Sequence, residues 1–151
     1  MQEKLFNVYI LFFCFLSITT IDVSTVEELH KTLTKARAGQ TISIAPGEYD
    51  YTEYESYNSY QLYSSGTESN PITLTAQDPD DPPILRGPIS KQGVVLHIRG
   101  SYWIIDNIKV ANGGRGILIE NSSYNIIRNV EIYNIGSKAV QIRDGATHNL
   151  F

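Results

Sequence analysis

The sequence predicts an all-β fold, a parallel β-helix or solenoid, because one segment repeats and its residue types suit strands. Residues 101–110 (SYWIIDNIKV) match residues 123–132 (SYNIIRNVEI) at an offset of 22 residues, and a third copy begins at Thr147. A short alternating strand precedes each copy, at residues 96–98, 117–119 and 140–142. Self-similarity at such a period is typical of solenoids, in which each unit buries its apolar face against its neighbours.

The residue types indicate which solenoid this is. Each repeat carries two apolar runs rich in Ile and Val, separated by Gly, Ser and Asn, with no amphipathic helix between them. β-Branched residues suit a pleated, packed surface, and small polar residues suit bends. Leucine-rich repeats have a similar length but usually return through a helix or a 3₁₀ turn. Here the return has the pattern of a second strand, which favours a parallel β-helix.

Placing the two copies in register gives a test of the repeat. The facing pairs are Asp106 with Arg128, Lys109 with Glu131, and Asn107 with Asn129. Opposite charges on strands about 4.8 Å apart contribute about 0.2–1 kcal/mol each. We expect the two asparagines to form an amide ladder at a bend. Chance pairing of surface residues is the alternative for the charges.

Length, charge and cysteine content narrow the class of protein. A chain of 151 residues allows one domain, and its formal net charge of −4 gives no reason to expect nucleic acid or an anionic membrane as a partner. The only cysteine, Cys14, lies in an N-terminal apolar stretch, and the three histidines are far apart in sequence. No zinc or other metal site is therefore predicted.

The N-terminus has the pattern of a secretory signal peptide. Residues 5–16 are mostly apolar, directly follow Lys4, and precede small and hydroxyl residues. The run is short for a membrane span, so we predict a signal peptide over residues 1–22, cleaved somewhere near Thr20 to Ser24. An uncleaved anchor is the alternative. The mature protein is expected to be secreted and extracellular, with no membrane contact after cleavage.

An amphipathic helix is predicted next, from about Thr25 to Ala38. Ser24 and Glu27 form a capping-box pattern at its start, and apolar residues follow at helical spacing up to Gly39. The first coil of a β-helix would otherwise expose its apolar interior and its unpaired backbone groups. We therefore expect this helix to cap the solenoid.

The segments after this helix resemble a known superfamily. Residues 36–49 (ARAGQTISIAPGEY) and 65–76 (SGTESNPITLTA) are similar to the opening of right-handed parallel β-helix proteins of the pectate lyase-like superfamily. The similarity is nearest to polysaccharide lyases of the chondroitinase B/alginate lyase type, and it covers about Val23 to Phe151. It implies a right-handed coil with an N-terminal capping α-helix. Because the third copy stops inside a strand, residues 23–151 are expected to be only the N-terminal coils of a longer β-helix.

Two loops have alternative interpretations. A regular series of tyrosines either stacks on sugar faces or packs against the first coils, and we favour packing; its members are Tyr51, Tyr54, Tyr57, Tyr60 and Tyr63. The proline-rich turn at residues 78–83 carries Asp78, Asp80 and Asp81, whose oxygens would suit calcium. A stiff turn without further ligands in sequence is the favoured interpretation.

Asn121-Ser122-Ser123 is an acceptor pattern for N-linked glycan, relevant if the host is a eukaryote.

Alternation in the short strands predicts two outward columns of side chains. One column is His97, Leu118 and Gln141, and the other is Arg99, Glu120 and Arg143. The second column is either a self-satisfied ion ladder or a patch whose arginines hold a sugar carboxylate through bidentate bonds. Arg99, Glu120 and Arg143 are accordingly the candidate substrate-binding residues, and the ladder is the favoured interpretation.

The resemblance implies lyase chemistry on uronate-containing polysaccharides. β-Elimination requires a cation or Ca²⁺ at the uronate carboxylate, a Lys or Arg base, and a proton donor for the leaving oxygen. Lys138, Arg143, Asp144 and His148 are the nearest weak candidates, but no family motif matches them. The catalytic coils, and Ca²⁺ if it is used, are expected in the missing part of the full-length protein.

The sequence thus favours a secreted polysaccharide lyase-like protein whose partner is an acidic polysaccharide. A non-catalytic carbohydrate-binding or surface β-helix is the alternative. A β-helix hydrolase would need paired acidic side chains on the outer strand face, where only Glu120 qualifies.

Overall fold

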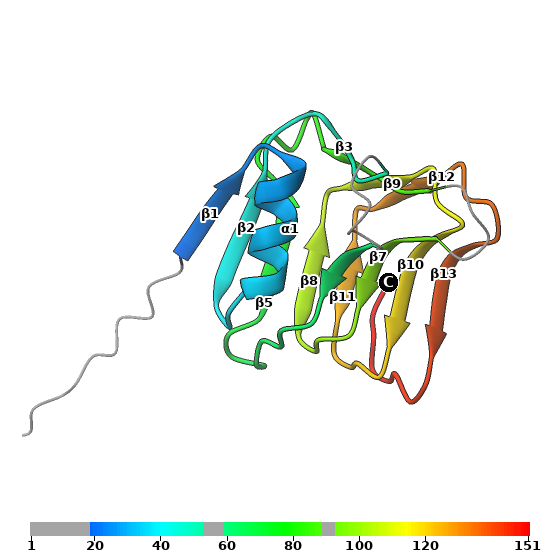
Figure 1. Cartoon of the computed structure of the whole chain (residues 1–151). Helices are drawn as coiled ribbons and strands as arrows, with labels where there is room; N and C mark the ends of the chain where they lie inside the picture. The colour runs from blue at the N-terminus through cyan, green and yellow to red at the C-terminus, as the bar shows by residue number, and fades with distance from the viewer. Residues whose placement is uncertain (1–18, 53–58, 89–92) are drawn as a thin grey trace, which may run out of the picture.

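The chain winds as a coil of parallel strands, and the computed structural model describes residues 19–52, 59–88 and 93–151 (Figure 1). In the first half the strands are β1 (Thr19–Val23), β2 (Gln40–Ile44), β3 (Glu48–Asp50), β4 (Tyr60–Leu62), β5 (Ile72–Ala76) and β6 (Ile84–Arg86). In the second half they are β7 (Val94–Ile98), β8 (Trp103–Asp106), β9 (Lys109–Ala111), β10 (Arg115–Glu120), β11 (Ile126–Arg128), β12 (Glu131–Tyr133) and β13 (Lys138–Arg143). The predicted all-β right-handed parallel β-helix is confirmed.

The strands form three parallel sheets that run along the coil axis. Their orders are β1-β2-β5-β8-β11, β13-β10-β7-β4 and β12-β9-β6-β3. Each complete turn therefore has three strands, whereas the sequence pattern indicated two. The second apolar run of each repeat is divided by one asparagine, Asn107 or Asn129, whose left-handed backbone (φ 52° and 53°) bends the chain onto the third sheet.

The predicted register of the core is confirmed. Ile127 pairs with Ile105, and Ile119 pairs with Ile98, each on the adjoining coil. Ile98, Ile105 and Ile119 are fully buried. Trp103 on β8 is also fully buried, and its indole N–H donates to the backbone oxygen of Ser64 at 2.7 Å. Aliphatic side chains thus stack coil on coil around a dry interior.

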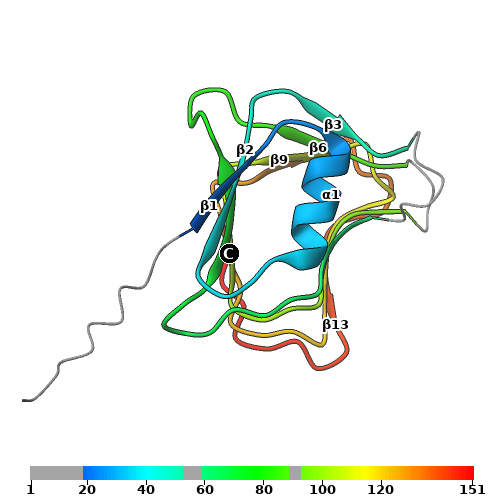
Figure 2. The same cartoon turned by 60° about the vertical axis from the view of Figure 1, so that its left-hand side comes forward.

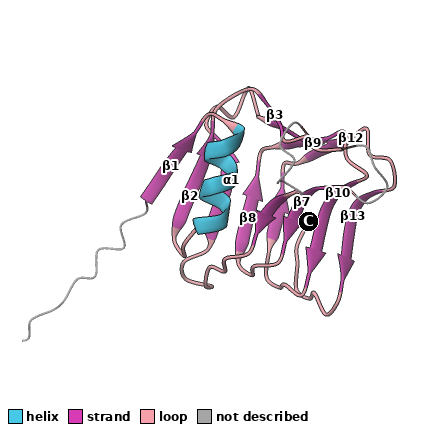
Figure 3. Cartoon of the chain, in the orientation of Figure 1, coloured by secondary structure: helices cyan, strands magenta, loops and turns pink. Residues whose placement is uncertain are grey.

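Helix α1 (Val26–Lys35) covers the N-terminal end of the coil, as predicted, and Figures 2 and 3 show it across the interior between the sheets. It buries Leu29 and Leu33 completely. The predicted cap was wrong by one residue. Thr25 is the N-cap, since its backbone is extended and its hydroxyl accepts from the N–H of Glu28 at 3.2 Å. The helix ends at Lys35, before the predicted Ala38, because the backbone leaves the helical region at Ala36.

The capping box is nevertheless reciprocal. Oε2 of Glu28 accepts from the N–H of Ser24 at 2.9 Å and from its hydroxyl at 3.2 Å. The acidic partner is therefore Glu28 and not Glu27. Two otherwise unpaired N–H groups are satisfied at the helix start, which fixes the direction in which the chain leaves β1.

Strand β1 begins at Thr19 and pairs in parallel with β2. Four residues of the segment predicted to be a signal peptide, Thr19 to Asp22, thus lie in the first sheet. The rest of that segment lies outside the described residues, and the signal peptide stays a prediction. Within the described part of the chain, no helix is both long enough and apolar enough to cross a membrane.

The asparagine ladder exists, but at a different bend. Nδ2 of Asn107 donates to the Pro79 backbone oxygen, and Nδ2 of Asn129 donates to Asp106, so these two asparagines do not bond each other. The ladder joins Asn125, which is fully buried, to Asn149 on the next coil, with Nδ2 of Asn125 2.9 Å from Oδ1 of Asn149. A buried bend leaves amide groups without water, so the ladder forms there.

The described tyrosines support packing over sugar stacking. Tyr51 and Tyr60 are buried with their rings edge to face, 5.2 Å between centroids. The Tyr51 hydroxyl donates to the Val94 backbone oxygen at 2.6 Å. Tyr63 differs, because it is 48% exposed. Tyr54 and Tyr57 lie outside the described residues.

Candidate functional site

The predicted charge column lies on the outer face of the β13-β10-β7-β4 sheet. Glu120 ends β10 and faces Arg143 at the end of β13, while Arg99 directly follows β7 on the other side. The in-register parallel strands place the three side chains side by side. The two charge pairs predicted from the repeat also form on other sheets. Asp106 lies 2.8 Å from Arg128, and Lys109 lies 3.9 Å from Glu131.

One buried carboxylate holds both arginines. Arg99 donates to Oε2 of Glu120 from Nε at 2.7 Å, with its Nη2 2.6 Å from the same oxygen, and Nη2 of Arg143 donates to Oε1. The Glu120 side chain is 9% exposed, against 44% for Arg99 and 42% for Arg143. Each guanidinium therefore keeps part of its hydrogen-bonding surface toward solvent. We name Arg99, Glu120 and Arg143 the arginine face.

Burial of Glu120 raises the pKa of its carboxyl group. Hydrogen bonds from Arg99 and Arg143, together with their positive charges, outweigh this effect and lower the pKa to about 2. Glu120 is thus ionised near neutral pH and is an acceptor only. It cannot act as a general acid there, so its role in this arrangement is to orient the two arginines.

His97 and Tyr63 complete the arginine face. Nε2 of His97 lies 3.1 Å from Oε2 of Glu120 and 3.2 Å from Nε of Arg99. Burial of the ring, followed by the charge of Arg99, lowers the His97 pKa. A neutral ring can use Nε2 either to donate to Glu120 or to accept from Arg99. On the exposed side, the Arg99 guanidinium lies 5.7 Å from the centroid of the Tyr63 ring, within cation–π range.

The second predicted column is less open than expected. Its members pair in register, His97 with Leu118 and Leu118 with Gln141. Leu118 was predicted to face outward, but it is only 2% exposed. Because Leu118 is covered, this column offers no free apolar surface.

The candidate catalytic residues do not form one site. Lys138 begins β13 and Arg143 ends it, which separates their backbones by about 16 Å at roughly 3.3 Å per residue. His148 lies beyond the next bend, stacked on Tyr124. Asp144 remains beside Arg143, with its Oδ2 3.2 Å from Nε. No base, cation and proton donor converge among these four residues.

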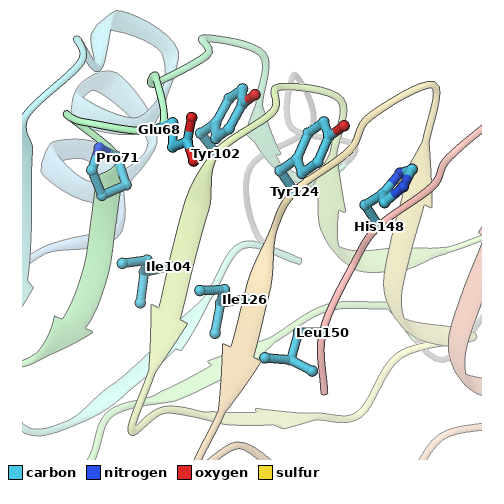
Figure 4. A pocket seen from close by; sticks show the side chains of 8 residues that line it. All are labelled: Glu68, Pro71, Tyr102, Ile104, Tyr124, Ile126, His148 and Leu150. Carbon is cyan, nitrogen blue, oxygen red and sulfur yellow. The ribbon is translucent and has the colours of Figure 1, made fainter.

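A stack of aromatic rings was not predicted from the sequence. Tyr102, Tyr124 and His148 stack coil on coil, with ring centroids 5.1 Å and 4.9 Å apart (Figure 4). All three have left-handed backbones, φ 60°, 60° and 54°. The repeated Ser-Tyr pairs at residues 101–102 and 123–124, followed by Thr147 and His148, were the signal for this stack.

A groove accompanies this ring stack on the β5-β8-β11 side of the coil. Figure 4 shows a second row, Ile104, Ile126 and Leu150, running parallel to the rings. Ile104 and Ile126 pair in register, and Ile126 bridges to Leu150. Glu68 and Pro71 line the N-terminal end of the groove, whose volume is about 590 Å³. This groove and the arginine face belong to different sheets.

The remaining predicted sites lie on exposed bends. Asn121 is exposed at the bend after β10, with φ 51°, and its glycosylation stays a prediction. Oδ1 of Asp78 accepts from the N–H of Asp80 at 2.9 Å, which makes a local turn. Within residues 19–52, 59–88 and 93–151, no group of three His, Cys, Asp or Glu side chains is arranged to hold a metal ion.

Comparisons with known structures agree with this architecture. The chain is 29% identical to the alginate lyase from Paenibacillus sp. str. FPU-7, with a TM-score of 0.79, covering 87% of this chain and 42% of that one. Pectate lyase Pel9A is 18% identical, with a TM-score of 0.69, covering 89% of this chain and 39% of that one. The alginate lyase AlyGC of family PL6 is 22% identical, with a TM-score of 0.57, covering 76% and 15%. The chain thus spans less than half of the length of these proteins.

No curated protein matches the chain. A family model does, described as "Pel9A-like, right handed beta helix region", and it covers residues 18–151. This range contains every described strand as well as helix α1. The chain belongs to the Pel9A-like right-handed β-helix family.

Proposed function

We propose that the chain is the N-terminal part of a secreted polysaccharide lyase-like protein that acts on an acidic, uronate-containing polysaccharide. The observation that carries this proposal is the arginine face, where Glu120 holds two half-exposed arginines on the outer surface of one sheet. The 29% identity to an alginate lyase supports the substrate class.

Charge and geometry suit a sugar carboxylate. Arg99 and Arg143 carry two positive charges against the single charge of Glu120, so this trio has a net charge of +1, part of which the exposed Asp144 offsets beside Arg143. A guanidinium has five donors in a fixed fork, and Glu120 does not use all of them. The free edge of Arg99 can bind a uronate carboxylate bidentately, Arg143 can add the donors that Glu120 and Asp144 leave free, and the exposed Tyr63 ring gives the sugar an apolar surface beside Arg99.

Such binding would assist β-elimination. Neutralising the uronate carboxylate makes the C5 proton more acidic. A base then takes this proton, the electron pair forms the C4–C5 double bond, the C4–O4 bond breaks, and O4 accepts a proton. The arginine face would supply the first of these requirements. The base and the donor are proposed to come from coils beyond Phe151.

Binding without cleavage is the second candidate function for this chain. It is favoured by the separation of Lys138, Arg143 and His148, so that no base and proton donor converge among these candidates. In that case the chain retains acidic glycans and releases no product.

The experiment combines retention with product detection. The full chain is run through gels containing alginate, polygalacturonate or chondroitin, and the absorbance of unsaturated uronate is followed in solution. We expect retardation that the double variant Arg99→Gln/Arg143→Gln loses. Arg128→Gln is the matched control, since Arg128 is 58% exposed on a different sheet. Absence of both retardation and product with all three glycans would refute the proposal, and product formation would decide in favour of the enzyme.

A further inference from the structure

The ring stack links successive coils, but part of its surface remains exposed to solvent. Offset or parallel ring contacts contribute about 0.5–1.5 kcal/mol each, and these contacts tie three successive coils together. Yet Tyr124, the central ring, is 48% exposed. Its faces are covered by its neighbours, so the exposed part is its edge and hydroxyl group. Figure 4 shows the Tyr102 and Tyr124 hydroxyls at the ends of the rings away from the backbone.

The backbone at this bend is unusual for aromatic residues. A bulky residue in the left-handed region is a genuine outlier, and such conformations cost on the order of 1–3 kcal/mol each. Tyr102 and Tyr124 both adopt it, at φ 60°. Asparagine occupies the left-handed position at the bends after β8 and β11, where it is tolerated more easily. The tyrosines therefore keep their rings aligned at a conformational cost.

The groove has the composition of a binding site. Its second row is aliphatic, with Ile104 and Ile126 part-buried and Leu150 exposed. A volume of about 590 Å³ lies within the range of small-molecule sites, which are mostly apolar with a few polar groups that fix orientation. Here the polar groups are the Glu68 carboxylate, the His148 imidazole and the two phenolic hydroxyls, which have no hydrogen-bond partner among the described residues.

Charge decides which ligand fits. Glu68 is the one acidic residue lining the groove, and no Lys or Arg lines it. A uronate would meet a carboxylate without a compensating guanidinium, which is unfavourable in a partly apolar site. A neutral pyranose presents an apolar C–H face to isoleucine and hydroxyl groups to tyrosine and glutamate. The arginine face has the opposite preference.

We propose that the groove between the Tyr102–Tyr124–His148 stack and the Ile104–Ile126–Leu150 row binds uncharged sugar residues of a polysaccharide. It is a second glycan site, separate from the arginine face. The rows span three coils, about 10 Å at roughly 4.8 Å per coil, so the ligand lies along the coil axis. This inference does not depend on the proposed lyase-like function.

The test uses the full chain and soluble neutral glycans. Affinity gels containing a β-glucan, a xylan, a galactomannan or a galactan are compared with gels containing alginate. We expect at least one neutral glycan to retard the wild-type chain. Tyr124→Asn removes the central ring while an asparagine accepts the left-handed backbone. Ile126→Glu places a charge in the aliphatic row without shortening the strand. Each is expected to weaken retardation at least tenfold.

Two controls separate this inference from the proposed function. Arg99→Gln/Arg143→Gln should leave neutral-glycan retardation unchanged, and both groove variants should keep alginate retardation. Far-ultraviolet circular dichroism and the denaturation midpoint establish that each variant is folded. The inference is overturned if no neutral glycan retards the wild-type chain. It is equally overturned if folded Tyr124→Asn and Ile126→Glu chains are retarded as strongly as wild type.

Discussion

Two outer faces of the same coil are ordered by different interactions. On the β13-β10-β7-β4 sheet, Glu120 fixes Arg99 and Arg143 through ionic hydrogen bonds. On the β5-β8-β11 side, Tyr124 stacks between two other rings, and the nearby Asn125 ladder holds the coils in register. Both faces rest on one aliphatic core, so the difference lies in the outward positions and in the buried asparagine at one bend.

This difference shows that a solenoid places separate requirements on its buried positions and on its outward positions. Its buried positions must repeat, because each coil packs on the next. Its outward positions need only satisfy their neighbours in the same column, by charge in one sheet and by ring contact in another. The first face should therefore respond to salt and to acid through Glu120, whereas ring contacts and amide hydrogen bonds hold the second.

The largest expected effect is at the amide ladder. Asn125→Ala removes the side-chain oxygen that accepts from the backbone N–H of Trp103 at 2.9 Å. It also removes the hydrogen-bond partner of the Asn149 side chain. Leaving buried polar groups unpaired costs about 1–3 kcal/mol each. We expect a loss of about 2–4 kcal/mol in the free energy of unfolding, measured by urea denaturation and equal at pH 5 and pH 8. Gln141→Ala, a similar truncation on the other sheet, should change it by less than about 0.5 kcal/mol. Equal losses in the two variants would contradict the ladder's role.

The second effect is specific to the arginine face. The pKa of Glu120 is lowered from 4.5 to about 2, so its contribution is fully present above pH 4.5 and is lost as the pH falls toward 2. Glu120→Gln should cost about 1–2 kcal/mol at pH 7, a value reduced by the solvent exposure of both arginines. The difference between variant and wild type should shrink between pH 4.5 and pH 2. A difference that stays constant over this range would show that the charge of Glu120 is not the cause.

A smaller effect is expected at the ring stack. Tyr124→Asn removes two ring contacts on a half-exposed side chain, but asparagine accepts the left-handed backbone more easily, so the expected net loss is about 1 kcal/mol. Because the contacts removed are ring contacts and not ion pairs, 1 M salt should leave most of this loss unchanged. Denaturant titrations of the variant and wild type, with and without salt, measure it. A salt-dependent loss would mean that the two faces do not differ as described.

The smallest effect is at an exposed ion pair. Arg128→Ala removes two hydrogen bonds to Asp106, at 3.0 Å and 2.8 Å. Exposed pairs contribute about 0.2–1 kcal/mol and are screened by salt. The loss in unfolding free energy should therefore nearly vanish in 1 M salt. A loss well above 1 kcal/mol would indicate that this pair is needed for coil register.

The repeat in the sequence was sufficient to predict the core. A period of 22 residues assigns Ile105 and Ile127 to adjoining layers, and alternation assigns Glu120 to an outward column between two arginines. These are one-dimensional properties, so spacing alone determines them. The capping helix was also predictable, because its apolar spacing is strong, although the cap itself moved from Ser24 to Thr25.

The shape of each turn was not predictable in the same way. Whether a turn has two strands or three depends on a left-handed backbone at one residue, Asn107, and a sequence pattern does not give that angle. The same uncertainty misplaced the amide ladder. The ring stack was not predicted for the same reason, since Tyr102 and His148 both stack on Tyr124 only if the successive bends turn equally. Lys138 and His148 are close to Arg143 in sequence, but strand length and the following bend separate them.

The most direct test is the affinity of one uronate oligosaccharide for two variants, measured by titration calorimetry at low salt. Charge-assisted hydrogen bonds contribute about 1.5–3 kcal/mol each, and 1.4 kcal/mol corresponds to tenfold in affinity. Arg99→Gln/Arg143→Gln should bind at least about tenfold more weakly than wild type, whereas Tyr124→Asn should bind equally well. Unchanged affinity in the arginine variant, or an equal loss in Tyr124→Asn, would contradict the assignment of acidic glycan to the arginine face.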